Sequence, residues 1–275
     1  MKYHIDKNNW TVVLDDVDFK SVTQSDINDI AKLLSLHLVV VARQQSLTIE
    51  DELRIFKMFD SPYSFQPTTN PNDSYVDGCV LPESDGYILR VTARPDDDGK
   101  PGFAPNDGDA IWHCDNPLRP VRKSITWLYG VEGTVGSRTS WINNAVAYAD
   151  LPDSLKEQIK DLKCQMCHYT DKEPSEYNHT PSLVHTNISG LTGLYFPFES
   201  ISHFVDMPVA DSRAIIDTLI KHVTQEKYMY HHDWQDGDVV LHEQWLSIHH
   251  RWPFKDLTNR MLHRGIFDFP NQNYK

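Results

Sequence analysis

The sequence has few cysteines, no long apolar run and a deficit of positive charge, and each shortage excludes a class of protein. Its four cysteines in 275 residues are too few and too scattered for the disulfide framework of a small secreted domain. The longest apolar run, around residues 33–42, is interrupted by a histidine and is shorter than the ~20 residues of a membrane-spanning helix. We therefore expect neither a disulfide scaffold nor a membrane protein.

The charge balance argues against nucleic acid and anionic membranes as partners. Lys and Arg total 26 against 39 Asp and Glu, so the formal net charge is -13, whereas such partners require a basic surface. The first residues lack the apolar segment of a signal peptide, which predicts a cytoplasmic protein. No linker and no internal repeat divides the chain, so we expect residues 1–275 to form one domain. We expect this domain to act on a small molecule, and a homo-oligomer is compatible with the sequence.

Many short strands and a few helices are expected from the hydrophobic pattern. Helices are predicted at 23–34, 48–59 and 209–224, with shorter ones opening near 143 and 153. Alternating or continuous apolar segments predict strands at 38–42, 86–91, 124–129, 138–142, 164–170, 183–185, 194–196, 239–241 and 260–269. This pattern predicts a β-rich α+β fold of the sandwich or jelly-roll kind, with flanking helices.

A long irregular segment, residues 61–109, interrupts this pattern. It contains seven prolines and the acidic run Asp96-Asp97-Asp98-Gly99. Long loops inside compact domains are typically lids or binding loops, although a plain surface loop is the alternative. Because the segment directly precedes the first candidate site, we favour a lid that covers the substrate.

The first candidate site is the triplet His113-Cys114-Asp115. In an extended strand residues i and i+2 point to the same face, so His113 and Asp115 can hold one ion together. One nitrogen ligand and one anionic oxygen suit Fe(II), Mn(II) or Zn(II) better than calcium. Such a triplet is common by chance, and alone it indicates no more than a strand end.

A second segment strengthens this interpretation. His249 is followed by Arg260 and Arg264 at offsets of eleven and fifteen residues. The two arginines are four apart on the last predicted strand and therefore share a face. Guanidinium groups that point into a β-rich core need anions, and these are either ligand carboxylates or some of the acidic side chains of the chain itself.

These spacings resemble the taurine dioxygenase / TfdA-like family of Fe(II)- and 2-oxoglutarate-dependent oxygenases. The family pattern is His-x-Asp, a distant His, and Arg eleven and fifteen residues beyond it. The opening "Leu38-Val39-Val40-Val41-Ala42-Arg43-Gln44-Gln45-Ser46-Leu47-Thr48" and the later segments 181–186 and 234–238 also resemble family signatures. The similarity therefore covers nearly the whole chain, and it implies a double-stranded β-helix, or jelly-roll, core.

The resemblance also implies roles for individual residues. His113, Asp115 and His249 match the iron ligands, and Thr139 and Arg260 match the pair that binds the far carboxylate of 2-oxoglutarate. Arg264 matches a position that faces the anionic group of the substrate in sulfonate-using members; the alternative is a second contact to 2-oxoglutarate. Fe(II), 2-oxoglutarate and O2 are the implied cofactor and cosubstrates, and succinate and CO2 the products. Because halogenating relatives have a small residue in place of the acidic ligand, Asp115 argues for hydroxylation or desaturation of a small anionic or zwitterionic metabolite.

Two departures and several alternatives accompany this interpretation. Glu243-Gln244 stands where the family commonly has Asp-Asn, and His250 beside His249 allows a one-residue slip, although only His249 keeps the eleven-residue offset. A non-catalytic cupin-like binding protein is the main alternative. A hydrolase is disfavoured because there is no Gly-x-Ser-x-Gly motif, and Cys114 is expected to face away from the metal. The haem-attachment pattern in 164–168 is attributed to a strand with two thiols.

Overall fold

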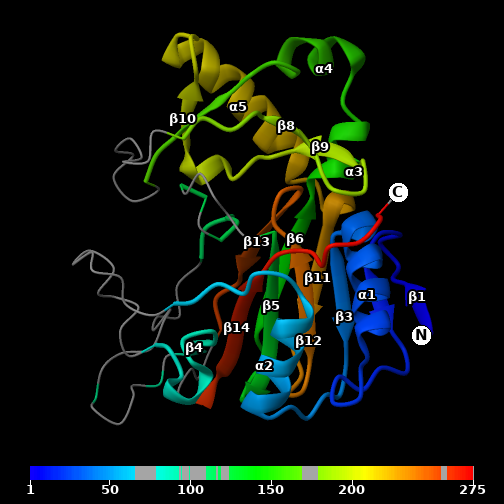
Figure 1. The fold of residues 1–275 in the computed structure, drawn as a ribbon. Coiled ribbons are helices and arrows are strands. Elements are labelled where there is room, and N and C mark those ends of the chain that lie inside the picture. Colours follow the sequence, from blue (N-terminus) through cyan, green and yellow to red (C-terminus); the bar gives the residue numbers. More distant parts are fainter. Residues whose placement is uncertain are drawn as a thin grey trace.

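Two β-sheets face each other across the molecule in the computed structural model, which describes residues 1–65, 79–92, 94, 99, 110–115, 117–118, 124–168, 179–254 and 259–274 (Figure 1). The larger sheet has the order β1-β2-β3-β12-β5-β14-β4 and is antiparallel except between β2 and β3. In that order its strands are Tyr3–Ile5, Val12–Leu14, Val39–Ala42, Val239–Glu243, Ile125–Glu132, Met261–Phe267 and Leu89–Thr92. The smaller sheet has the order β11-β6-β13, with strands Met229–Asp233, Arg138–Asn143 and Ser247–Arg251.

The inner faces of the two sheets meet in one apolar layer. Trp141 and Tyr230 of the smaller sheet pack with Leu128, Val240 and Leu262 of the larger sheet. Period-two alternation along each strand places every second side chain in this layer. The arrangement is β-rich with flanking helices, as predicted, and is consistent with a jelly-roll.

Two helices cover the outer face of the larger sheet. They are α1 (Gln24–His37) and α2 (Ile49–Met58), and each opens with the predicted capping box, at Thr23 and Thr48. Phe56 of α2 packs on Phe267 of β14, with ring centroids 5.2 Å apart. A Cβ atom at Gly265 would lie 2.3 Å from the Phe56 ring, so this close helix–sheet approach requires glycine.

A second group of helices and short strands forms the top of the molecule in Figure 1. It contains α3 (Asn144–Ala149), α4 (Asp153–Ile159) and α5 (Val209–Val223). Two antiparallel strand pairs accompany them: β7 with β10 (Cys164–Met166, Ile201–Phe204) and β8 with β9 (Val184–Thr186, Thr192–Leu194). Short 3₁₀ helices lie at Pro82–Ser84, Phe198–Ser200 and Glu226–Tyr228.

This helical part packs on the outer face of the smaller sheet. Ile142 of β6 and Ile248 of β13 belong to its apolar cluster, and so does the fully buried Cys114. Cys114 therefore faces away from the layer between the sheets, as predicted.

Several boundaries differ from the sequence predictions. β4 begins at Leu89 rather than Gly86, and β9 spans Thr192–Leu194, whereas the strand was expected at 194–196. Position 193 in this strand requires glycine, because a Cβ atom there would lie 2.7 Å from the Cα of Ala145. The predicted strand 164–170 ends at Met166, and residues 169–170 lie outside the described part.

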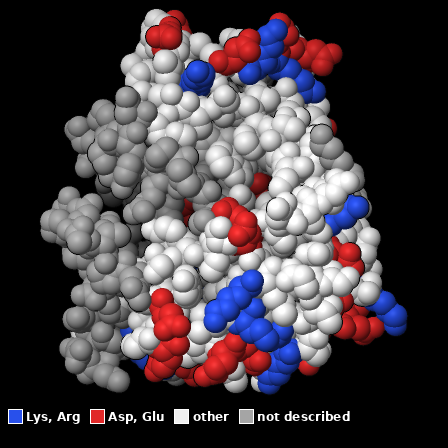
Figure 2. Space-filling view, viewed as in Figure 1, with Lys and Arg blue, Asp and Glu red and all other residues white. Residues whose placement is uncertain are grey.

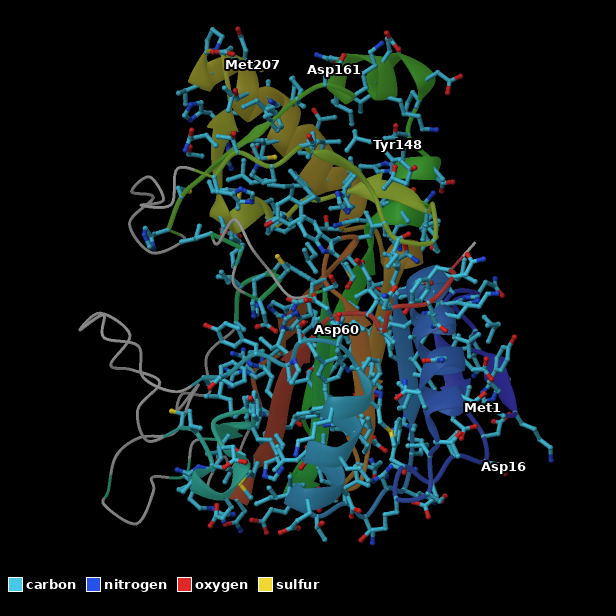
Figure 3. The ribbon with its side chains drawn as sticks, viewed as in Figure 1. Met1, Asp16, Asp60, Tyr148, Asp161 and Met207 are labelled. Atoms are coloured by element: carbon cyan, nitrogen blue, oxygen red, sulfur yellow. The ribbon has the colours of Figure 1, made fainter. Side chains whose placement is uncertain are left out.

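Most of the predicted lid, residues 61–109, lies outside the described residues, but its start and a described stretch in its middle are anchored. Asp60, labelled in Figure 3, exchanges two backbone hydrogen bonds with Asp268, at 3.1 and 2.7 Å, beyond the end of β14. The backbone N–H of Phe65 donates to the carbonyl of Gly86 at 2.7 Å. The segment therefore starts and returns beside β14, the strand that carries the predicted arginine Arg264.

The visible surface carries mixed charges. Figure 2 shows acidic and basic side chains gathered at the two ends of the molecule in this view, with a largely uncharged band between them. Within the described part of the chain, no helix is both long and apolar enough to span a membrane.

Candidate metal and anion site

Three side chains from distant parts of the sequence meet between the sheets. One ligand atom each from His113, Asp115 and His249 lies within 4.8 Å of the others. His113 and His249 are joined by two backbone hydrogen bonds, of 3.0 and 2.7 Å, so residue 113 extends the smaller sheet beside β13. Their rings lie 4.1 Å apart between centroids. The structure thus brings together the three residues that the sequence predicted as iron ligands.

Hydrogen bonding fixes which nitrogen of His113 faces the other two side chains. Its Nδ1 lies 2.7 Å from the backbone carbonyl of Ile111, which makes Nδ1 the protonated nitrogen and leaves the Nε2 lone pair for a metal. The Nδ1 atom of His249 is buried and has no hydrogen-bond partner among the described residues.

The carboxylate of Asp115 is held on both of its oxygens. The Thr126 hydroxyl donates to Oδ2 at 2.7 Å, and Nη1 of Arg264 donates to Oδ1 at 2.8 Å. The backbone N–H of Asp115 donates to the side-chain carbonyl of Gln244 at 2.7 Å. These contacts fix the carboxylate relative to the two imidazoles.

Sequence reasoning missed the roles of Thr126 and Gln244. Thr126 lies in a strand that was predicted, and alternation could have placed its hydroxyl on the inner face. Its partner was not foreseeable, because the contact depends on how β5 packs against the His113 segment. Gln244 was noted only as a departure from the family pattern.

The charge states at this site favour metal binding. Burial lowers the pKa of His249 well below its ordinary value, and it also lowers that of His113. Burial would raise the pKa of Asp115, but the charge of Arg264 beside it and the neighbouring imidazoles hold it well below its usual range. At neutral pH the site therefore offers two neutral imidazoles and one carboxylate, the forms that coordinate divalent metals.

A fourth histidine, which the sequence analysis did not identify, belongs to the same neighbourhood. The His242 ring lies 4.7 Å from that of His249 and 5.7 Å from the Trp141 ring system, between centroids. Burial lowers the pKa of His242 to about 4, so the ring is neutral at pH 7. The alternation of β12 could have placed it on the inner face two residues after Val240.

A second buried charge, Arg260, lies directly before the first residue of β14. Arg260 is only 4% exposed, and its Nε donates to the hydroxyl of Ser137 at 3.1 Å. Its guanidinium carbon lies 4.7 Å from the centre of the Phe254 ring. Burial and the nearby charge of Arg251 lower the pKa of Arg260 to about 9. Within the described residues no carboxylate pairs with this guanidinium, so it is suited to an anion from outside the chain.

Thr139 lies on the inner face of β6, in register with Arg251 of β13. Its hydroxyl oxygen accepts a hydrogen bond from the indole N–H of Trp234 at 2.9 Å. The hydroxyl hydrogen of Thr139 therefore remains a donor, and none of the described residues accepts it. Like Arg260, Thr139 can donate to an anion.

Arg264 was expected to face the anionic group of the substrate or to make a second contact to 2-oxoglutarate. Its guanidinium group contacts Asp115, and the guanidinium carbon also lies 5.5 Å from the centre of the Phe65 ring. Phe65 belongs to the start of the predicted lid. Arg264 thus lies between a candidate metal ligand and the segment expected to cover the substrate.

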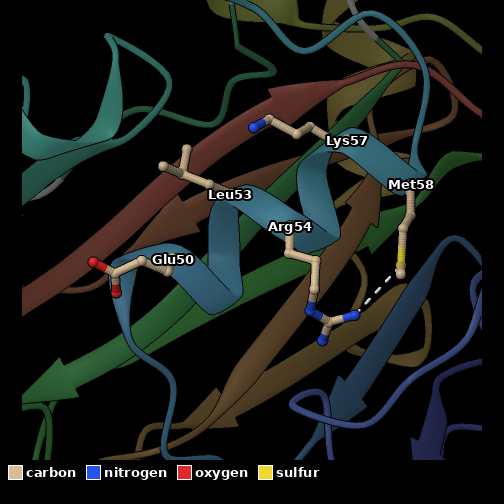
Figure 4. Close-up of a pocket in the computed structure, with 5 residues that line it drawn as sticks. All are labelled: Glu50, Leu53, Arg54, Lys57 and Met58. Carbon is tan, nitrogen blue, oxygen red and sulfur yellow. Dashed lines mark hydrogen bonds between the residues drawn. The ribbon is translucent and has the colours of Figure 1, made fainter.

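Two surface hollows lie elsewhere. One is lined by one side of α2, shown in Figure 4, where Arg54 approaches the sulfur of Met58 at 3.7 Å. Arg54 also donates to the backbone carbonyls of Phe19 and Val22. The other is lined by polar residues around Arg43 and Asp238, which are ion-paired with each other. Neither hollow includes a member of the His-Asp-His group, and the contacts of both arginines are structural.

Comparisons with known proteins agree with this geometry. The model of the family described as "Taurine catabolism dioxygenase TauD, TfdA family" matches residues 6–266. The chain is 22% identical over 265 residues to the alpha-ketoglutarate-dependent 2,4-dichlorophenoxyacetate dioxygenase of Burkholderia sp., covering 89% of this chain and 86% of the relative. It is 25% identical over 249 residues to the (S)-phenoxypropionate/alpha-ketoglutarate-dioxygenase of Sphingobium herbicidovorans, covering 82% and 80%.

Solved structures share the fold. A taurine dioxygenase from Burkholderia xenovorans superposes with a TM-score of 0.77 at 20% identity, covering 94% of this chain and 86% of the other. The protein AAD-2, solved with Mn(II) and N-oxalylglycine, gives a TM-score of 0.77 at 19% identity and covers 99% of both chains.

Proposed function

The chain belongs to the TauD, TfdA family of Fe(II)- and 2-oxoglutarate-dependent dioxygenases, and we propose that it oxidises a small anionic or zwitterionic metabolite at the His113-Asp115-His249 site. It is therefore an oxidoreductase, with Fe(II) as cofactor and 2-oxoglutarate (α-ketoglutarate) and O2 as cosubstrates. In this proposal residues 1–275 form one domain, and the facing sheets are its double-stranded β-helix core.

The site assignment rests on one observation: a three-ligand group and a buried arginine both lie at the layer between the sheets. His113, Asp115 and His249 form a three-ligand group, and three protein ligands leave coordination positions for exogenous ligands. Arg260 is a buried guanidinium without a carboxylate partner among the described residues. A dicarboxylate whose one end binds the metal and whose other end pairs with Arg260 satisfies both features.

We assign Arg260 and Thr139 to the far carboxylate of 2-oxoglutarate. Arg260 supplies the charge, and Thr139 supplies a hydroxyl donor whose oxygen is fixed by Trp234. The iron supplies the oxidation chemistry once bound, while these residues orient the cosubstrate and exclude water from it.

We assign Arg264 to the anionic group of the substrate. Its contact with Asp115 places it beside the metal ligands, so an anion bound to Arg264 would hold a neighbouring C–H bond close to the iron. The names of the relatives support this class of substrate, since 2,4-dichlorophenoxyacetate and phenoxypropionate are both carboxylates. Phe65 lies near Arg264, which supports a lid function for residues 61–109.

Asp115 favours hydroxylation or desaturation, because a carboxylate ligand occupies the position that a halide would need. The alternative is a non-catalytic binding protein with the same fold. It is disfavoured because a protein without turnover has no evident use for a complete ligand set beside a buried arginine that none of the described carboxylates pairs with. We further propose a cytoplasmic enzyme, without nucleic-acid or membrane partners, that can form a homo-oligomer.

The test is succinate release. Purified protein with Fe(II), 2-oxoglutarate and O2 should form succinate, faster with one member of a panel of small carboxylates, sulfonates and amino acids. Product mass separates hydroxylation (a gain of one oxygen) from desaturation (a loss of two hydrogens). The Arg260→Ala variant should need ten- to a hundredfold more 2-oxoglutarate, because a charge-assisted hydrogen bond contributes about 1.5–3 kcal/mol. Metal-dependent ligand binding without any succinate would favour the binding protein instead.

A further inference from the structure

We infer that His242 is a further cosubstrate-binding residue, whose imidazole N–H donates a hydrogen bond to the metal-chelating 2-oxo acid end of 2-oxoglutarate. This inference rests on the proposed function, because it requires 2-oxoglutarate to lie between the metal ligands and Arg260.

The register of the larger sheet places His242 opposite the metal ligands. On β12 it is paired with Thr126 of β5, whose hydroxyl donates to Asp115. Residues paired across neighbouring antiparallel strands have their side chains on the same face, so His242 points into the layer between the sheets. From there its ring meets that of His249 at 4.7 Å between centroids.

Within the described part of the chain, the polar atoms of His242 lack a hydrogen-bond partner. The residue is 0% exposed, and neither ring nitrogen has a hydrogen-bond partner among the described residues. A neutral imidazole always carries one N–H donor and one acceptor, and a buried donor without an acceptor destabilises the folded state. His242 does not belong to the group of ligand atoms within 4.8 Å of one another, so the geometry does not make it a fourth metal ligand.

A second unpaired donor lies beside it. The indole Nε1 of Trp141 is buried without a hydrogen-bond partner in the described part of the chain, and the Trp141 ring system lies 5.7 Å from the His242 ring between centroids. A polar ligand bound beside these two rings would satisfy both donors.

The smaller sheet shows which ligand fits there. Trp141 is the register partner of His249, and Thr139 lies two residues away on the same face of β6. A molecule that spans from the metal ligands to Thr139 and Arg260 therefore passes Trp141. Because His242 contacts the Trp141–His249 end of this path, it meets the chelating end of 2-oxoglutarate rather than the far carboxylate.

The test separates the two ends of the cosubstrate. Under anaerobic conditions, 2-oxoglutarate and 2-oxobutyrate, which has the chelating end but lacks the far carboxylate, are titrated by calorimetry into the Fe(II)-loaded full chain. The His242→Phe variant should bind both compounds about tenfold more weakly, and His242→Gln, which keeps a donor, should recover most of the loss. The Arg260→Leu variant should weaken 2-oxoglutarate alone.

A spectroscopic readout and a matched control accompany the titration. The visible charge-transfer absorption of the Fe(II)–2-oxo acid chelate should shift in His242→Phe and return towards the wild-type position in His242→Gln. His250→Phe is the control: this neighbour of His249 stacks on Trp112, 5.0 Å away between centroids, and should change neither readout. Should His242→Phe fail to fold, His242→Leu, which is smaller and equally apolar, gives the same comparison.

Unchanged 2-oxoglutarate affinity and an unshifted band in the apolar variants would overturn the assignment of His242. A loss confined to 2-oxoglutarate, with 2-oxobutyrate unaffected, would also overturn it, because the contact would then be to the far end. If wild-type protein binds neither compound in a metal-dependent manner, the proposed function itself fails, which is a different result.

Discussion

At the scale of single residues, the site is built from groups that are costly to bury unless a ligand completes them. Asp115 has its compensation within the protein, in Thr126 and Arg264. Among the described residues, Arg260 has the neutral hydroxyl of Ser137 but no carboxylate, and His242 has no hydrogen-bond partner. Asp115 and its partners therefore fix the metal-binding geometry, whereas Arg260 and His242 are suited to bind a diffusible ligand.

The first prediction concerns the metal. Replacing His113, Asp115 or His249 with Ala should abolish Fe(II) binding, or binding of its spectroscopic substitute Mn(II), while circular dichroism shows an unchanged fold. Electron paramagnetic resonance of free Mn(II) measures the binding directly. His250→Ala is the control, since its side chain stacks on Trp112, outside the ligand group. If His250→Ala failed to bind metal and His249→Ala still bound it, the assignment of His249 as the distal ligand would be wrong.

The second prediction concerns Arg264. The Arg264→Ala variant should weaken substrate binding about ten- to a hundredfold, the range expected for loss of one charge-assisted bond, and should form succinate without a matching amount of product. Parallel measurement of succinate and oxidised product gives the coupling ratio. A variant that loses only 2-oxoglutarate affinity would instead show that Arg264 is a second contact to the cosubstrate.

At the scale of elements, much of the fold followed from local signals, and much of the site did not. Capping boxes at Thr23 and Thr48 located α1 and α2, and alternation located β5 and β6. The strands β11 and β13 are rich in histidine, so their apolar pattern is weak, and the sequence pattern predicted neither strand. The resemblance of the ligand spacing to the family pattern was enough to predict which three side chains meet.

Predicting the partners of those side chains would have required knowledge of the strand register. Thr126 reaches Asp115, and His242 reaches His249, only because β12 pairs with β5 in one register and the His113 segment pairs with β13. A shift of one residue would turn each of these side chains to the opposite face. Such cross-strand contacts are not visible in a single sequence.

The third prediction concerns the attachment of α2 to the larger sheet. Glu52 of α2 is fully buried and accepts hydrogen bonds from Nε1 of Trp127, at 3.0 Å, and from Nδ1 of His263, at 2.6 Å. Glu52→Ala leaves both donors unsatisfied and should lower the free energy of unfolding by about 3 kcal/mol. Glu50→Ala, at an exposed position of the same helix, should have a much smaller effect, because solvent screens its interaction with the helix N-terminus. Urea denaturation measures both, and equal losses would show that the buried contacts contribute nothing specific.

At the scale of the whole molecule, the concentration of buried neutral histidines links the site to stability. His113, His232, His242 and His249 all have pKa values lowered by burial. The larger and smaller sheets both contribute to this set, so opening the layer between them exposes all four rings to protons at once. The metal-free protein should therefore be sensitive to mild acid.

The last prediction concerns how the free energy of unfolding changes with pH through His242. The pKa of His242 is about 4 in the folded protein and about 6.5 when unfolded, so between these values the unfolded chain binds more protons. The stabilising contribution is complete above pH 6.5 and is lost as the pH falls towards 4. Between pH 7 and pH 5 the metal-free wild type should lose about 2 kcal/mol of unfolding free energy through His242 alone, at about 1.4 kcal/mol per unit below 6.5. Urea denaturation at both pH values should show that His242→Phe loses less than wild type by about this amount. Equal losses in the two proteins would mean that His242 is already solvated or protonated in the folded state.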